Sequence, residues 1–177
     1  SCDAIDIHPY DCRIRGERDI NIRNIEKVTG ILNSKKEFTF AFISDTQRWY
    51  DETEGAVEDI NRRGVDFVIH GGDLTDFGAT KEFLWQRDIL NRLNVPWIAL
   101  IGNHDCLGSG EQAFKAIFGE LNFSFKVGNV LFVCLNTNAL EYDYNTPVPD
   151  FSFMSELLGN IPEGVEKTVF VMHARPY

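Results

Sequence analysis

The sequence lacks the marks of several large classes of protein. No stretch of the 177 residues approaches the roughly 18 consecutive apolar residues that a membrane-spanning helix needs. The four cysteines form no CxxC pair and no zinc-ribbon spacing, and a chain of this length does not need a disulfide framework. Basic residues are few: 17 Lys and Arg stand against 27 Asp and Glu, and the net charge of −10 argues against stable binding of nucleic acid.

The residues that are present suit one globular domain. Hydrophobic residues make up 44% of the chain and charged residues 25%, and 177 residues can bury one substantial core but not two. The acidic balance is compatible with a metal-centred enzyme, because bound cations locally reverse the sign of the electrostatic field.

The amino terminus carries a further signal. The chain begins Ser1-Cys2-Asp3, with no methionine and no signal peptide. A small residue followed by cysteine resembles the processed start of bacterial lipoproteins, in which that cysteine is acylated. This interpretation predicts a lipid anchor through Cys2 and a location in the bacterial cell envelope or otherwise outside the cytoplasm. The alternative is an ordinary cysteine beside a serine introduced by cloning.

Strands and helices alternate along most of the chain. Residues 1–37 are polar and read as an irregular amino-terminal extension, with one short helix predicted at 21–32. From residue 38 onward, buried strand-like runs alternate with amphipathic segments, and Gly128-Asn129 is a favourable two-residue hairpin turn. The alternation predicts an α/β fold with a mainly parallel sheet covered by helices on both faces. The predicted strands are 38–43, 66–70, 96–101, 123–127, 130–135 and 168–172, and the predicted helices are 53–63, 80–93, 110–118 and 151–158.

Polar residues that can bind metal follow four of the predicted strands. In open α/β sheets, ligands bind where the loops converge at the carboxyl ends of the strands. Carboxylate, carboxamide and imidazole groups together favour Zn, Mn or Fe, whereas a calcium site would be all oxygen. Each motif alone has another explanation, such as a helix cap or a turn, but turn chemistry does not readily place four of them in order at strand ends. The motifs are Asp45-Thr46-Gln47, Gly72-Asp73-Leu74-Thr75-Asp76, Gly102-Asn103-His104-Asp105 and His173-Ala174-Arg175.

These motifs resemble the successive motifs of calcineurin-like metallophosphoesterases, and the likeness covers residues 38–173. The Gly-Asn-His-Asp element is its most specific part. The resemblance implies a four-layer αββα fold, a mixed β-sandwich flanked by helices, over residues 38–177. It also implies two divalent metal ions (Mn, Fe, Zn or Mg) and hydrolysis of small phosphomonoesters or phosphodiesters.

The resemblance assigns metal ligands residue by residue. Asp73 would bridge both metals, and Asp45 would bind the first. Asn103 and His173 would bind the second. The family usually has histidine where this chain has Gln47. A neutral amide is a weaker donor than imidazole, so the first site should be weaker and should favour Mn or Mg over Zn; Gln47 could equally hold a water molecule or nothing.

Catalytic roles also follow from the resemblance. His104 would contact the phosphate and protonate the leaving group as a general acid, which suits an imidazole because its ordinary pKa lies near neutrality. Asp105 would orient the ring of His104, and Asn103 would contact the substrate as well as the metal. Arg175 could bind the phosphate bidentately or could be an ordinary solvated side chain.

One family element is missing from this sequence. The family continues beyond the last histidine to a Gly-His-x-His segment that supplies one more ligand to each metal. We expect either that the carboxyl-terminal part of the domain is missing or that the centre lacks two histidines. The alternative function is that of a degenerate family member that binds a phosphorylated or glycan ligand without turnover.

Several other residues admit a structural role. Arg48, Trp49 and Tyr50 could line the mouth of the site or serve solvated and packing roles. His70 alternates with Val68 along a strand and is predicted to be structural. The second long helix and its approach are predicted to face the core with Phe77, Phe83, Leu84, Trp85, Ile89 and Leu90.

Overall fold

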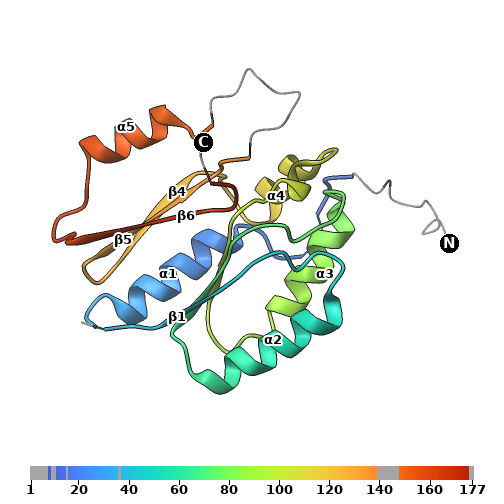
Figure 1. Cartoon of the computed structure of the whole chain (residues 1–177), viewed down its shortest axis with the longest axis horizontal. Coiled ribbons are helices and arrows are strands. Elements are labelled where there is room, and N and C mark those ends of the chain that lie inside the picture. The colour runs from blue at the N-terminus through green and yellow to red at the C-terminus, as the bar shows by residue number, and fades with distance from the viewer. Residues whose placement is uncertain (1–7, 9–10, 15, 36, 139–147, 176–177) are drawn as a thin grey trace.

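Two three-stranded sheets form the centre of the described part of the chain (Figure 1). The computed structural model describes residues 8, 11–14, 16–35, 37–138 and 148–175, and Cys2, with its predicted lipid anchor, lies outside them. The first sheet is parallel throughout, in the order β1-β2-β3, and the second has the order β4-β5-β6, with β4 antiparallel and β6 parallel to β5. The strands are β1 (Phe40–Ile43), β2 (Phe67–His70), β3 (Trp97–Ala99), β4 (Phe123–Val127), β5 (Val130–Leu135) and β6 (Lys167–Met172).

The two sheets pack face to face, and helices cover their outer faces. Between the sheets, Phe67 of the first meets Phe132 of the second edge to face, with ring centroids 5.7 Å apart. This is the four-layer αββα fold that the family resemblance implies, so the fold class is confirmed. The mainly parallel sheet covered by helices on both faces, which the alternation of elements predicted, is not found, because one face of each sheet packs against the other sheet. The outer helices are α2 (Tyr50–Arg63), α3 (Thr80–Leu90) and α4 (Gly110–Ile117) on the first sheet and α5 (Phe151–Gly159) on the second. Among the described residues, no helix is long and apolar enough to cross a membrane.

The predicted amino-terminal helix belongs to this core. α1 (Ile20–Leu32) packs along β3 and β4, where it closes one edge of the sandwich (Figure 1). The side chain of Asn21 donates to the carbonyl of Ala99 at 2.8 Å and accepts from its N–H at 2.9 Å, and Asn24 donates to the carbonyl of Trp97 at 2.8 Å. These amides pair with the free edge of β3 as a further strand would. The boundary expected at residue 38 therefore does not separate two structural units.

The helix α3 buries a narrower surface than predicted. Phe83, Ile89 and Leu90 lie in the core as expected. Phe77 and Trp85 do not, because their side chains are 60% and 46% exposed. Phe77 precedes the helix in a loop, and two residues along a helix turn a side chain by about 200°, so Trp85 lies on the face opposite Phe83.

Candidate metal centre

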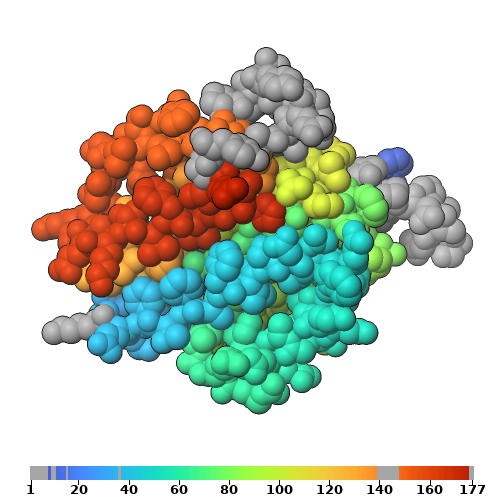
Figure 2. Space-filling view, in the orientation of Figure 1, coloured from blue at the N-terminus to red at the C-terminus, as the bar shows by residue number. Residues whose placement is uncertain are grey.

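The candidate site lies where the loops after β1, β2, β3 and β6 meet. Figure 2 shows the red carboxyl-terminal segment beside the cyan and yellow segments on one face of the molecule. Two glycines allow the loops after β2 and β3 to touch. A Cβ at Gly102 would lie 2.1 Å from Oδ1 of Asp73, and a Cβ at Gly72, where φ is +106°, would lie 2.7 Å from the backbone nitrogen of Gly102. Any larger residue at either position would push the loops apart.

Asp45, Asp73 and His173 come together here, each from a different loop. One ligand atom of each lies within 4.8 Å of the others. Nε2 of His173 is 3.4 Å from Oδ2 of Asp73 and 3.0 Å from Oδ1 of Asn103. Asp45 and Asp73 have left-handed backbones, with φ of 58° and 57°. Aspartate tolerates this conformation better than most residues, and such strain concentrates at functional sites.

The backbone orients the ring of His173. Its Nδ1 lies 3.0 Å from the carbonyl oxygen of Gly71, which can only accept, so Nδ1 carries a proton and Nε2 faces Asp73. Metal-binding histidines are usually held in this way. The hydrogen bond to Asp73 raises the pKa of His173 despite its burial. Burial by itself raises the pKa of Asp73, but the hydrogen bond and charge of His173 outweigh it and lower that pKa. The carboxylate is therefore ionised and ready to bind a cation.

His104 is held beside the carboxylate of Asp73. Its backbone N–H donates to Oδ1 of Asp73 at 3.0 Å. Its ring Nδ1 lies 2.9 Å from the carbonyl oxygen of Asp76 and donates to it. The ring is therefore fixed by the loop after β2, and none of the described residues is hydrogen-bonded to its Nε2.

The prediction that Asp105 orients the ring of His104 is wrong. The buried carboxylate accepts the N–H groups of Gly102 at 2.9 Å, Leu74 at 3.2 Å and Thr75 at 2.8 Å. Both oxygens are thus used by the backbone of the loops after β2 and β3. Burial raises the pKa of Asp105 to about 6, although these hydrogen bonds work in the opposite direction. Asp105 ties the two ligand-bearing loops together.

Gln47 and Arg175 have different surroundings. The backbone N–H of Gln47 donates to the carbonyl of Asp73 at 3.1 Å, which places it in the loop beside the cluster. Its side-chain Oε1 is buried and has no hydrogen-bond partner among the described residues. Arg175 is exposed and forms no hydrogen bond or ion pair with another described residue. Gln47 therefore has an amide oxygen available for a cation. The binding of phosphate by Arg175 stays a prediction.

His70 has the structural role that was predicted for it. The ring is wholly buried at the end of β2. Its Nε2 lies 2.8 Å from the hydroxyl of Thr46, and its Nδ1 accepts the N–H of Gly72 at 3.2 Å. The side chain of Gln86 donates to the carbonyl of Thr46 at 2.6 Å. These contacts hold the loops after β1 and β2 in register beneath the cluster.

Two polar residues after β5 brace the site and were not predicted. The amide of Asn138 donates to the carbonyl of Ile101 at 2.9 Å, and the hydroxyl of Thr137 donates to the carbonyl of Ala174. Each acceptor adjoins a residue of the site loops, Ala174 next to His173. The signal for these residues was present in the sequence, because they directly follow a buried strand as the four motifs do.

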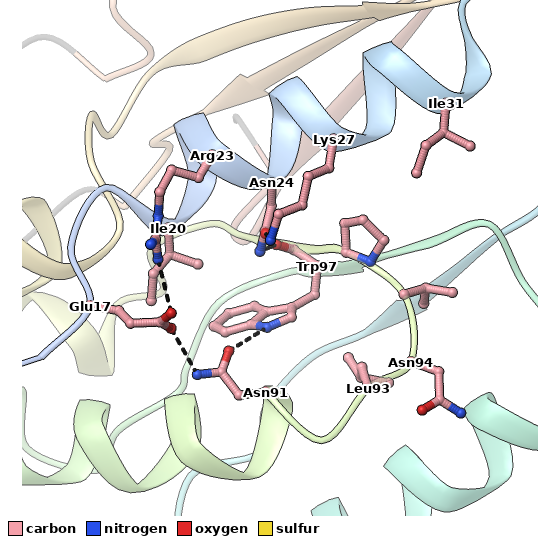
Figure 3. A pocket seen from close by; sticks show the side chains of 12 residues that line it. Glu17, Ile20, Arg23, Asn24, Lys27, Ile31, Asn91, Leu93, Asn94 and Trp97 are labelled. Atoms are coloured by element: carbon pink, nitrogen blue, oxygen red, sulfur yellow. Dashed lines mark hydrogen bonds and ion pairs between the residues drawn. The ribbon is translucent and has the colours of Figure 1, made fainter.

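A separate hollow lies at the amino end of β3 (Figure 3). Arg23 and Lys27 of α1 lie on one side of it, and Asn91 lies on the other, near the ring of Trp97. The side-chain oxygen of Asn91 accepts from Nε1 of Trp97 at 3.2 Å, and its nitrogen donates to Glu17 at 3.1 Å. The polar groups that line the hollow thus largely bond with one another. The hollow lies at the end of the sheet away from the metal-ligand cluster.

A comparison with known protein families agrees with the fold and with the cluster of Asp45, Asp73 and His173. The model of the calcineurin-like phosphoesterase family matches residues 38–177. The chain belongs to the calcineurin-like phosphoesterase family. Members of this family are metal-dependent hydrolases of phosphoesters that typically bind divalent metals. The resemblance found in the sequence motifs is thereby confirmed.

Relatives within the family cover different parts of the chain. The DNA double-strand break repair protein Mre11 of Methanosarcina acetivorans is 27% identical over 136 residues, which are 72% of this chain and 22% of that protein. A 3',5'-cyclic-nucleotide phosphodiesterase of Nostoc is 29% identical over 83 residues, which are 47% of this chain and 31% of that protein. This phosphoesterase chain therefore spans between a fifth and a third of the length of these two relatives.

A solved structure has the same fold. Purple acid phosphatase PPD1 from yellow lupin (Lupinus luteus) seeds aligns with a TM-score of 0.57 and 15% identity. The alignment covers 75% of this phosphoesterase chain and 29% of the lupin chain. At this identity the likeness shows the fold alone.

Proposed function

We propose that this chain hydrolyses phosphomonoesters or phosphodiesters with two divalent metal ions held by Asp45, Asp73, Asn103 and His173. The observation that carries the proposal is the convergence of Asp45, Asp73 and His173 within 4.8 Å, at the strand ends of a calcineurin-like fold. Two carboxylates and an imidazole at this spacing are a donor set that suits divalent transition-metal cations.

The residues present fit divalent cations. The bond from Nδ1 of His173 to the Gly71 carbonyl leaves Nε2 to donate to a metal. Oδ1 of Asn103 lies 3.0 Å from that Nε2, so both ligands can reach the same ion. Gln47 offers a buried amide oxygen with no partner among the described residues. When bound, the cations would polarise the phosphoryl group and lower the pKa of a water molecule.

Asp73 is the residue best suited to bind both ions. Its Oδ2 faces His173, and the same carboxylate belongs to the cluster with Asp45. A shared carboxylate is needed because two cations close to each other repel. Because Gln47 replaces the usual histidine, the ion on the Asp45 side is expected to be held more weakly and to be Mn or Mg.

His104 is suited to give a proton to the leaving group. The carbonyl of Asp76 fixes its Nδ1, so the ring can present Nε2 to a substrate oxygen. Its neighbour Asn103 lies against His173, so the same short segment reaches both the metal ligands and the substrate. General acid catalysis of this kind typically accelerates a reaction about 100- to 10,000-fold.

Asp73→Asn tests the proposal. The variant replaces an anionic ligand by a neutral one and should lower bound Mn at both positions, together with the hydrolysis of bis-p-nitrophenyl phosphate. The matched control is Asp88→Asn, which neutralises an exposed carboxylate on α3. Metal content by elemental analysis and initial rates are measured on both. Wild-type metal content and rate in Asp73→Asn would refute the assignment.

The observation at Gln47 also favours a second candidate, a protein that binds phosphorylated ligands without turnover. A neutral donor in place of histidine weakens one metal position. This candidate predicts bound metal and bound phosphate with no hydrolysis of either monoesters or diesters. Metal analysis, a phosphate titration, and initial rates with p-nitrophenyl phosphate and bis-p-nitrophenyl phosphate distinguish it.

A further inference from the structure

Two large exposed aromatic side chains lie on the loops that carry Asp45 and Asp73. Trp49 is 53% exposed and Phe77 is 60% exposed. Exposed apolar rings next to a functional site commonly mark a binding surface. Trp49 directly follows Arg48, Phe77 directly follows Asp76, and Arg48 and Asp76 form an ion pair with Nη2 and Oδ1 2.5 Å apart. The two rings are therefore carried by loops that are clamped to each other.

Both loops belong to the proposed catalytic machinery. The loop after β1 carries Asp45 and reaches Trp49 four residues later. The loop after β2 carries Asp73, and the carbonyl of Asp76 holds the ring of His104. Phe77 is thus one residue away from the group that positions the proposed general acid.

The backbone of each aromatic residue is fixed. The N–H of Trp49 donates to the Thr46 carbonyl at 3.2 Å, and the carbonyl of Trp49 accepts from Thr53 at 2.9 Å. The N–H of Phe77 donates to the carboxylate of Glu82 at 3.2 Å. A surface whose backbone is already ordered loses little conformational entropy when a ligand binds.

Arg48 supports a functional role for this arrangement. Its φ of 59° is left-handed, which is unfavourable for arginine. Such a conformation persists where surrounding contacts impose it, and it is found preferentially at functional sites. Here the N–H groups of Gln47 and Trp49, on either side of Arg48, donate to the carbonyls of Asp73 and Thr46. The ion pair of Arg48 with Asp76 then joins the loop of Trp49 to that of Phe77.

We propose that Trp49 and Phe77 bind a planar aromatic ring of the substrate, such as a nucleobase, while its phosphate lies at the metal centre. The inference rests on the proposed function and narrows its substrate class to ring-bearing phosphoesters. Stacking suits these residues because every aromatic ring presents a π-face, whereas a sugar or alkyl group does not. The Arg48–Asp76 pair acts as a positioning element that keeps the two loops together.

The test compares two ligands with the same phosphate. Adenosine 5'-monophosphate and ribose 5-phosphate are titrated into the Mn-loaded protein, and binding is followed by calorimetry and tryptophan fluorescence. We expect the nucleotide to bind about tenfold more tightly or better, which is the effect of one stacked base. Trp49→Ala and Phe77→Ala should each remove most of this preference, and Trp49→Phe should keep most of it.

The control is Ile31→Ala, which removes an equally exposed apolar side chain from the separate hollow of Figure 3. It should leave the preference unchanged. Equal affinities for the two ligands, failure of the nucleotide to bind, or a preference that survives in both alanine variants would overturn the inference. Hydrolysis of bis-p-nitrophenyl phosphate is measured separately. Ring preference without hydrolysis would refute the proposed function alone, and hydrolysis without ring preference would refute the inference alone.

Discussion

The stability of this protein should fall in mild acid because His70 must stay neutral. The Gly72 N–H donates to its Nδ1, so the proton of the neutral ring sits on Nε2, facing Thr46. A second proton on Nδ1 would replace that acceptor with a donor and would bury a charge. Burial and the nearby charge of His173 lower the pKa of His70 to about 3, although Asp73 acts in the opposite direction.

The sign and size of the effect follow from linkage. In the unfolded chain the pKa is about 6.5. Below that pH the unfolded state takes up a proton that the folded state refuses, so the free energy of unfolding decreases as pH falls from about 6.5 to about 3. Each pH unit in this range is worth about 1.4 kcal/mol. Because the unfolded-state histidine is already half protonated at pH 6.5, the contribution of His70 should decrease by about 2 kcal/mol between pH 6.5 and pH 4.5.

The titration of Asp105 changes the free energy of unfolding in the opposite direction over an overlapping pH range. Its pKa is raised to about 6, so the folded state keeps a proton that the unfolded state releases, and its contribution decreases as pH rises from about 4 to about 6. The pH dependence of the wild-type protein alone would therefore conceal both effects. A variant that removes only His70 separates them, because Asp105 is present in both proteins and cancels in the difference.

The assay is urea denaturation of the wild-type protein and His70→Gln in a metal chelator at several pH values from 7.5 to 4.5. Glutamine can still donate toward Thr46 but cannot titrate. The difference in unfolding free energy, wild type minus variant, should fall by about 2 kcal/mol between pH 6.5 and pH 4.5. A difference that stays constant over this range would show that His70 accepts a proton in the folded state, and the argument from its burial would be refuted.

Two further substitutions test the site. His104→Gln should leave metal content intact and slow the hydrolysis of esters with poor leaving groups by about 100-fold or more, with a smaller loss for p-nitrophenyl esters that need little protonation; equal losses for both would contradict the role of general acid. Asp105→Asn replaces one carboxylate oxygen by an amide donor, which faces either the N–H groups of Gly102 and Leu74 or the N–H of Thr75. It should destabilise the fold by about 2 kcal/mol or more in urea denaturation and weaken metal binding. Unchanged stability would contradict its role in tying the loops together.

Much of the fold could be read from local patterns in the chain. The hairpin of β4 and β5 has the predicted bounds, because Gly128-Asn129 fixes the turn and the turn fixes the register. The proximity of Asp45 and Asp73 was also predictable, since each lies within three residues of the end of one of two parallel strands, and the carboxyl ends of such strands meet. His70 could be assigned a structural role from its place within a buried strand.

Other features depend on contacts between distant segments, which no local pattern records. Asn21 looks like a surface residue of a polar extension, but it pairs with Ala99, 78 residues away, and makes α1 part of the sheet edge. Asp105 adjoins His104 in the chain, yet its carboxylate points to backbone N–H groups about 30 residues away. A short side chain bonds to whichever donors packing brings within reach. Its neighbours in space are therefore set by how the loops close, and its neighbours in sequence do not reveal them.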